Sequence, residues 1–213
     1  MVENGVGKYF DKFFEIQGSL EFDPIALKQL LCEIESDSSL TSSDKDLLRG
    51  YLAYQYPEVL DKIDFEKEFI KVLENDPTNV LAREFLGYTY FDIGKYEDAC
   101  SNFEKVDLDK LFTWASIKVS ELIVCCYLEQ NHFDKAYELM IPVLNKALEC
   151  KTADYAWPTE LVNSLVKNRD ELLDHIGTDK YRNFTELLDA ILEKHQLKNL
   201  FKDQIQKINY DFC

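Results

Sequence analysis

The stretch VLAREFLGYTYFDIGKYEDACSNFEKV, residues 80–106, contains two helical patterns separated by a turn. Apolar and aromatic side chains recur at the spacing of one helix face on either side of Gly94. Glycine at this point favours a turn, because it takes the left-handed backbone conformation that ends a helix at little steric cost. The stretch therefore predicts two helices, 79–93 and 96–106, that fold back on each other.

Helical periodicity continues over almost the whole chain. Asp23-Pro24 predicts a helix start, since aspartate caps free backbone amides and proline fits the first turn. After a polar loop at 36–43, Ser43 or Asp44 is expected to cap the next helix. Besides the two helices above, we expect helices at 5–17, 24–35, 44–56, 63–75, 111–129, 133–149, 157–175, 179–194 and 197–208. No segment shows the alternation of a strand, so the predicted fold class is all-α.

Residues 46–79 are repeated, without a gap, at 80–113. The identical pairs fall mainly at helically spaced positions, as expected when each unit buries one face against its neighbours. These pairs are Leu47/Leu81, Arg49/Arg83, Leu52/Leu86, Tyr54/Tyr88, Tyr56/Tyr90, Phe69/Phe103, Lys71/Lys105 and Val72/Val106. A third, weaker copy covers roughly 117–150 and is three residues out of phase, with Asn131 at its turn.

The period and content of residues 80–113 resemble the tetratricopeptide repeat (TPR), a helix–turn–helix unit of 34 residues. The matching residues are Leu86, Gly87, Tyr90, Gly94, Tyr96, Ala99 and Phe103, entered through Asp76-Pro77. The resemblance implies a TPR-like right-handed α-α solenoid of antiparallel helix pairs, with irregular capping helices at both ends. Residues 1–213 would then form a single helical-repeat domain, with N-terminal helices in 1–43, repeats in 46–150 and C-terminal helices in 151–213.

In TPR proteins the first helix of each repeat lines a concave surface that binds a protein partner. By resemblance, the partner-binding positions here carry aromatic side chains at Tyr51, Tyr54, Phe85, Tyr88 and Phe91, and acidic ones at Glu58, Glu84, Asp92, Glu121 and Glu129. The Lys, Arg and Asn residues with which some members clamp acidic chaperone tails are nearly absent at the matching positions. An aromatic and acidic groove suits a basic partner, through cation–π and charge-assisted contacts.

The charge of the chain agrees with a basic partner. Its 24 Lys and Arg against 40 Asp and Glu give a net charge of −16. Residues 1–113 carry −12 of this total and residues 114–213 carry −4. Such a surface repels phosphates, which argues against nucleic acid or an anionic membrane as the partner, and it speeds encounter with a basic protein. The alternative that the acidity only keeps the protein soluble stays open.

The sequence predicts no active site, metal site or cofactor. Its three histidines, His132, His175 and His195, are isolated from one another, and no Cys/His spacing suits zinc. We expect the cysteines to be small buried hydrophobes in a reducing compartment, except for an exposed thiol at Cys213. Neither a signal peptide nor an apolar stretch long enough to span a membrane occurs, so we expect a cytoplasmic protein that is not an enzyme.

These features predict a protein–protein interaction module, specifically an immunity or antitoxin-like inhibitor of a basic toxin. The alternative is a TPR scaffold or assembly chaperone that joins several proteins without inhibiting them. The phenylalanines of the first helix, Phe10, Phe13 and Phe14, are expected either to pack as an N-terminal cap or to mediate oligomerisation.

Overall fold

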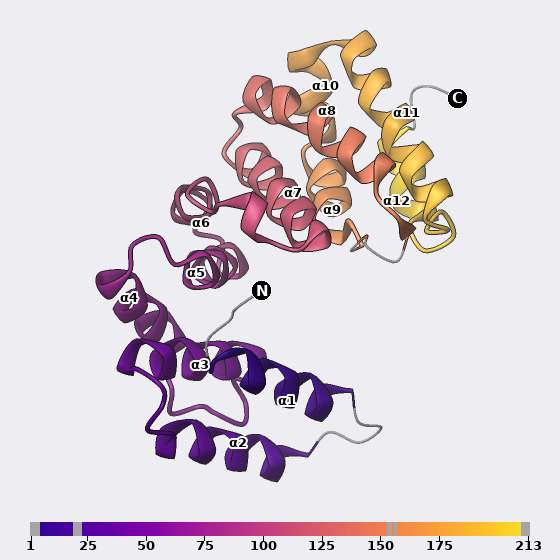
Figure 1. The fold of residues 1–213 in the computed structure, drawn as a ribbon. Coiled ribbons are helices and arrows are strands. Elements are labelled where there is room, and N and C mark those ends of the chain that lie inside the picture. Colours follow the sequence, from indigo (N-terminus) through magenta and orange to yellow (C-terminus); the bar gives the residue numbers. More distant parts are fainter. Residues whose placement is uncertain (1–4, 19–22, 153–154, 156, 210–213) are drawn as a thin grey trace. The chain divides into compact units, whose positions relative to one another are not determined.

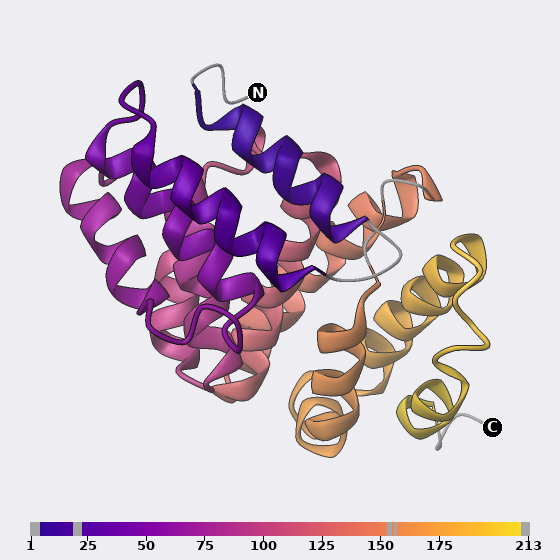
Figure 2. The ribbon, with the colours of Figure 1, turned by 90° about the horizontal axis from the view of Figure 1, so that it is seen from below.

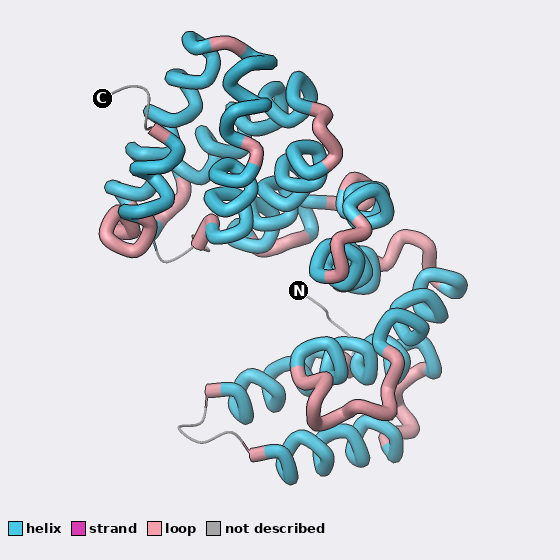
Figure 3. The backbone as a smooth tube through the Cα atoms, turned by 180° about the vertical axis from the view of Figure 1, so that it is seen from behind, coloured by secondary structure: helices cyan, strands magenta, loops and turns pink. Residues whose placement is uncertain are grey.

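The computed structural model describes residues 5–18, 23–152, 155 and 157–209. All regular elements in these ranges are helical, which confirms the all-α prediction (Figure 1; Figure 3). The chain divides into two compact units, residues 1–89 and 90–213, which we call the N-terminal and C-terminal units. The prediction of one helical-repeat domain stays a prediction. Among the described helices, none combines the length and the apolar character needed to cross a membrane.

The helices of the N-terminal unit are short and pack on their neighbours in sequence. They are α1 (Gly7–Gln17), α2 (Pro24–Ser36), α3 (Ser42–Gln55), α4 (Phe65–Asn75) and α5 (Val80–Asp92), the last of which continues into the C-terminal unit. Helix α1 packs on α2, α2 on α3, and α3 on α4; Figure 2 shows α1 and α2 side by side.

The C-terminal unit is built around α7 and α8. Its helices are α6 (Tyr96–Phe103), the 3₁₀ helix η1 (Leu108–Lys110), α7 (Thr113–Glu129), α8 (Phe133–Glu149), α9 (Thr159–Lys167), α10 (Arg169–Ile176), α11 (Thr178–Lys194) and α12 (Lys202–Ile208). Helix α7 packs against α6, α8 and α9, and α8 packs against α10 and α11.

Local sequence signals explain how two of these helices begin. The Asp23 carboxylate accepts hydrogen bonds from the backbone N–H groups of Ile25 (2.8 Å) and Ala26 (3.1 Å), as predicted. The cap of α3 is Thr41 rather than Ser43 or Asp44. Its hydroxyl accepts from the Asp44 N–H (3.1 Å), while the Asp44 carboxylate accepts from the Thr41 N–H (3.0 Å), which makes a capping box.

The predicted helix at 157–175 is wrong, because the chain forms two helices there, α9 and α10. Asn168 separates them with φ of −101° and ψ of 17°, and its buried side chain donates to the Ser164 carbonyl (2.9 Å). An asparagine that bonds its own backbone competes with the helical hydrogen bonds, which favours a break. Apolar spacing continues through the break, so periodicity alone did not reveal it.

The turns that follow α5 and α7 have the same backbone geometry. Each contains one residue in the left-handed region, Gly94 (φ 75°) and Asn131 (φ 59°). In each turn, the backbone N–H of the residue after this one donates to the carbonyl of the residue five positions before the donor. The two bonds are Lys95 N–H to Tyr90 O (2.8 Å) and His132 N–H to Tyr127 O (2.9 Å). The out-of-phase copies at 80–113 and 117–150 therefore share their turn.

Several residue pairs of the 34-residue repeat also share their burial. The buried pairs are Leu52/Leu86, Phe69/Phe103 and Val72/Val106. In the first copy, Gly50 lets α3 approach α4 closely, because a Cβ there would lie 2.8 Å from the ring of Phe69. Three of the apolar identities of the repeat thus lie in the core in both copies.

The identical residues Arg49 and Arg83 make different contacts in their two copies. The Arg49 guanidinium binds Glu68 of α4 (2.8 Å and 3.1 Å), Glu35 of α2 (2.7 Å) and Asp46, and so links three helices. The Arg83 side chain donates only to the carbonyl of Pro77 (2.6 Å and 2.8 Å) among the bonds the structure describes.

This difference predicts unequal effects of the same substitution at the two arginines. Arg49→Ala leaves the buried carboxylates of Asp46 and Glu68 without their shared cation, so we expect a loss of about 3 kcal/mol in the free energy of unfolding. Arg83→Ala removes two hydrogen bonds to a single exposed carbonyl and is expected to cost less than ~1 kcal/mol. Urea unfolding of the two variants measures both losses; equal losses would show that the Arg49 network does not stabilise the unit.

The shared turn predicts a second pair of effects. At Gly94 no atom lies within 4 Å of an added Cβ, so a substitution there meets backbone strain and not a clash. We expect Gly94→Ala to lower the free energy of unfolding by ~1 kcal/mol. Gly94→Asn should cost less than half as much, because asparagine already occupies this conformation at Asn131. Urea unfolding checks the order, and an equal loss for the two variants would contradict it.

Candidate functional site

Tyr51, one of the aromatic residues predicted to line the groove, lies in the core of the N-terminal unit. Its ring meets those of Phe10 (4.7 Å between centroids), Phe13 (5.1 Å) and Phe85 (4.9 Å), all edge to face. Phe10 and Phe13 thus pack α1 onto α3, as expected for an N-terminal cap. Phe14 is 54% exposed and contacts only the ring of Phe13 among the ring contacts described.

Four half-buried rings continue this cluster toward the surface. Tyr54 of α3 contacts Phe65 of α4 (5.7 Å) and Phe85 of α5 (5.5 Å), and Phe85 contacts Tyr88 (5.6 Å). We call Tyr54, Phe65, Phe85 and Tyr88 the aromatic surface. The edge-to-face contacts fix the rings relative to one another, and each of the four residues keeps part of its surface exposed.

A buried carboxylate lies next to the aromatic surface. Glu84 is only 4% exposed, and its Oε1 accepts a hydrogen bond from the Tyr88 hydroxyl (2.9 Å). Burial raises the pKa of Glu84 to about 7, although the Tyr88 bond opposes the change. The pKa of Tyr51 is raised to about 12, mainly by burial and secondly by the nearby charge of Glu84.

The C-terminal unit contains a matching carboxylate at Glu121, the residue that corresponds to Glu84 in the third copy. Glu121 is 1% exposed, and its Oε1 accepts a hydrogen bond from the Tyr155 hydroxyl (3.0 Å). Burial raises its pKa to about 7, against the opposing effects of the Lys118 charge and the Tyr155 bond. Lys118 is itself ion-paired with Glu160.

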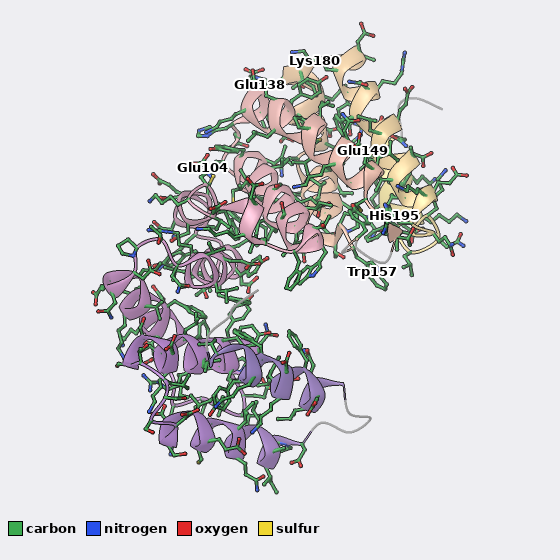
Figure 4. The ribbon with its side chains drawn as sticks, viewed as in Figure 1. Glu104, Glu138, Glu149, Trp157, Lys180 and His195 are labelled. Atoms are coloured by element: carbon green, nitrogen blue, oxygen red, sulfur yellow. The ribbon has the colours of Figure 1, made fainter. Side chains whose placement is uncertain are left out.

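Tyr155, which binds Glu121, lies in the connection between α8 and α9 and packs on a residue at the end of α11. The ring of Tyr155 stacks on buried His195 (4.3 Å), whose Nε2 lies 3.1 Å from the Ala147 carbonyl. His195 Nδ1 is buried without a hydrogen-bond partner in the described structure. Lys118 holds the same connection by donating to the carbonyl of Trp157 (3.1 Å); His195 and Trp157 are labelled in Figure 4.

Glu129, also predicted to face a partner, binds other side chains of the C-terminal unit. Its carboxylate accepts from Ser164 (2.8 Å) and Asn168 (3.3 Å) and forms an ion pair with Lys167. These bonds join α7 to α9 and to the start of α10. Glu129 therefore has a structural role.

The other predicted residues lie nearer the solvent. Glu58 and Asp92 are exposed, and Phe91 is half-buried with its ring 5.4 Å from that of Tyr96. The N-terminal unit thus brings together Tyr51, Tyr54, Phe85, Tyr88 and Glu84. Phe91, Asp92, Glu121 and Glu129 belong to the other unit, and a single groove lined by all ten residues stays a prediction.

Sequence reasoning missed Tyr155 and His195 as neighbours of Glu121. Tyr155 lies in a connection without helical periodicity, and His195 is isolated from the other histidines in the sequence. The repeat alignment identifies Glu121 itself, but no sequence spacing links it to side chains from two later segments.

The cysteine prediction is confirmed only in part. Cys100, Cys125 and Cys126 are buried, whereas Cys32 lies on an exposed face of α2, so its expected burial is wrong. Cys213 lies outside the described residues. Within those residues, no group of three or more His, Cys, Asp or Glu side chains is placed to hold a metal ion.

Comparison of the chain with protein families, curated proteins and solved structures gives no match. The likeness to the TPR family therefore depends on the residues described above. Buried carboxylates with a pKa near neutrality are typical of functional sites. Here each has a tyrosine hydroxyl as its hydrogen-bond partner, and each holds a proton at a pH at which the unfolded chain has lost it.

This difference predicts that Glu121→Gln stabilises the protein at high pH. The folded pKa of about 7 lies above the reference value of 4.5, so the folded state binds the extra proton and stability falls as pH rises from 4.5 to 7. Glutamine keeps the acceptor for Tyr155 and does not ionise. We expect the variant to gain up to ~3 kcal/mol in the free energy of unfolding at pH 8, and little at pH 4.5.

Urea unfolding at both pH values measures this gain. Glu149→Gln is the matched control, because it makes the same change of charge at an exposed position at the end of α8 (Figure 4). A gain at Glu121 that does not depend on pH, or that Glu149→Gln reproduces, would contradict the assignment of a raised pKa.

Proposed function

We propose that this chain is a protein-binding helical-repeat module whose partner presents a basic surface. The observation that carries the proposal is the aromatic surface of Tyr54, Phe65, Phe85 and Tyr88, whose half-buried rings come from three helices. Rigid aromatic rings provide large contact area at little entropic cost and are enriched at protein interfaces.

Exposed acidic side chains lie in the connection between two of the helices that carry these rings. The connection between α3 and α4 joins the helix ends that carry Tyr54 and Phe65, and it exposes Glu58 and Asp61. A lysine or arginine of the partner would therefore meet both an aromatic ring face and a carboxylate. This combination favours a basic partner over an acidic one.

A TPR-like stack of helix pairs is part of the proposal. One observation supports it: the packing of α7 on both its preceding and its following helices. In stacked repeats each helix pair buries its faces against adjacent pairs in this way.

We propose further that binding neutralises the partner, as in an immunity or antitoxin-like inhibitor. A toxin that acts on nucleic acid needs a positive surface for phosphates. A protein of net charge −16 is complementary to such a surface, and by covering it would block the substrate.

One observation favours a second candidate, a scaffold or assembly chaperone. The chain forms two compact units, each with its own core, and two units can offer two binding surfaces. A scaffold would hold two partners at once, whereas an inhibitor would bind one and abolish its activity.

The test uses the full chain as bait in a lysate of its source, at low and at raised salt, with bound proteins identified by mass spectrometry. The dissociation constant of the recovered partner is then measured by calorimetry. We expect one basic protein, with affinity that falls as salt rises and at least a tenfold loss of affinity for the Tyr54→Ala, Tyr88→Ala double variant.

Tyr137→Ala is the control, since it removes a half-buried tyrosine from α8, which belongs to the C-terminal unit. Circular dichroism confirms that each variant is folded. Unchanged affinity in the folded double variant would show that the aromatic surface is not the binding site, and affinity that is indifferent to salt would contradict a basic partner.

A further inference from the structure

Glu84 is a buried carboxylate to which no cation is paired among the described residues. It is 4% exposed, and the Tyr88 hydroxyl donates the hydrogen bond that the structure describes for its carboxylate (2.9 Å). A hydroxyl is a neutral donor and does not balance a negative charge. Buried carboxylates normally have a cation beside them, so Glu84 must be neutralised by a proton or by a cation from another molecule.

The cations of the helices around Glu84 are bonded to other groups. Helix α5 meets α3 and α4 through Phe85, whose ring contacts those of Tyr51 (4.9 Å) and Phe69 (5.9 Å). Tyr51 faces Glu84 and keeps its own proton at neutral pH, because its pKa is raised to about 12. The cations of α3, α4 and α5 are Lys45, bonded to the Glu35 carbonyl, Arg49 and Lys71, bonded to Glu68, Lys67, paired with Asp64, and Arg83, bonded to the Pro77 carbonyl.

Tyr88 connects this carboxylate to the aromatic surface. Its hydroxyl donates to Glu84, while its half-buried ring contacts Phe85 (5.6 Å), which Tyr54 of α3 also contacts (5.5 Å). A lysine or arginine that docks on such a ring lies within about 6 Å of the ring centroid. A partner's cation on Tyr88 would therefore lie on the residue that binds Glu84, where it attracts the ionised carboxylate.

The proton on Glu84 and a cation on Tyr88 compete with each other. Burial raises the pKa of Glu84 to about 7, and the Tyr88 hydrogen bond acts in the opposite direction. A cation nearby stabilises the ionised carboxylate and so lowers this pKa in the complex. The complex then holds fewer protons than the free protein below pH 7, and linkage requires the affinity to rise with pH in this range.

We propose that Glu84 is the proton-linked acidic group of the partner-binding site, which gives up its proton when a lysine or arginine of the partner docks on Tyr88. The inference rests on the proposed function, because it needs the partner's cation on the aromatic surface. The carboxyl O–H bond breaks, the proton passes to the buffer, and the carboxylate keeps both electrons. The complex consequently weakens in mildly acidic surroundings.

The experiment uses the full chain and an octaarginine peptide that carries a rhodamine dye, with affinity measured by fluorescence anisotropy at pH 6 and pH 8 and constant ionic strength. We expect about fivefold tighter binding at pH 8. Glu84→Gln imitates the protonated side chain, so its affinity should stay near the wild-type value at pH 6 at both pH values. Glu58→Gln, which alters an exposed carboxylate of the same unit, is the control and should keep the wild-type response.

A second variant separates the hydroxyl of Tyr88 from its ring. Tyr88→Phe keeps the ring for the cation but removes the hydrogen bond that lowers the pKa of Glu84, so the rise in affinity should move to higher pH. Calorimetry of the wild-type protein at pH 6.5, in two buffers of different ionisation enthalpy, counts the released protons without any substitution. We expect about half a proton for each bound peptide.

The outcomes distinguish this inference from the proposed function. Peptide binding that the Tyr54→Ala, Tyr88→Ala double variant weakens, but that releases no proton or keeps its pH response in Glu84→Gln, would overturn the role of Glu84 and leave the aromatic surface as the binding site. Binding that the double variant does not change would contradict the proposed function, and the inference with it.

Discussion

The whole structure depends on one constraint: its helices are too short to be stable on their own. The longest described helices have 17 residues and several have 8 or fewer, lengths at which an isolated helix is barely stable in water. Each helix is therefore stabilised by the apolar face that it buries against a neighbour. This explains why aromatic rings are so frequent at the helix contacts of the N-terminal unit, where Tyr51 and Phe85 each touch several others.

The same constraint gives the buried polar groups their importance. Once short helices are packed closely, a carboxylate at their interface loses water and must find a partner inside the protein. Arg49 gathers three carboxylates, Glu129 is bound by three donors from α9 and from Asn168, and Glu84 and Glu121 each meet a tyrosine. These solutions differ in charge: Arg49 supplies a cation to its carboxylates, whereas burial raises the pKa of Glu84 and of Glu121 to about 7 beside a neutral tyrosine hydroxyl.

The helical class, the turns at Gly94 and Asn131 and most helix bounds follow from the sequence, because each depends on neighbours within a few residues. The break at Asn168 and the cap at Thr41 depend on side-chain hydrogen bonds that compete with the helix, and periodicity does not register them. Of the predicted site, the ring contacts of Tyr51, Tyr54, Phe85 and Tyr88 are present in the N-terminal unit. The burial of Glu84 and Glu121 does not follow from the sequence; for Glu121 it depends on side chains such as Tyr155 that are remote in sequence.

The protonated state of Glu84 and Glu121 also changes how the acidity of this protein is to be understood. The formal charge of −16 counts every carboxylate as ionised. With pKa values of about 7, the two buried glutamates together hold about one proton at pH 7 in the folded state. Unfolding releases this proton, so the denatured chain carries more negative charge than the folded chain. The electrophoretic mobility of the native protein therefore reflects a smaller net charge than its composition suggests.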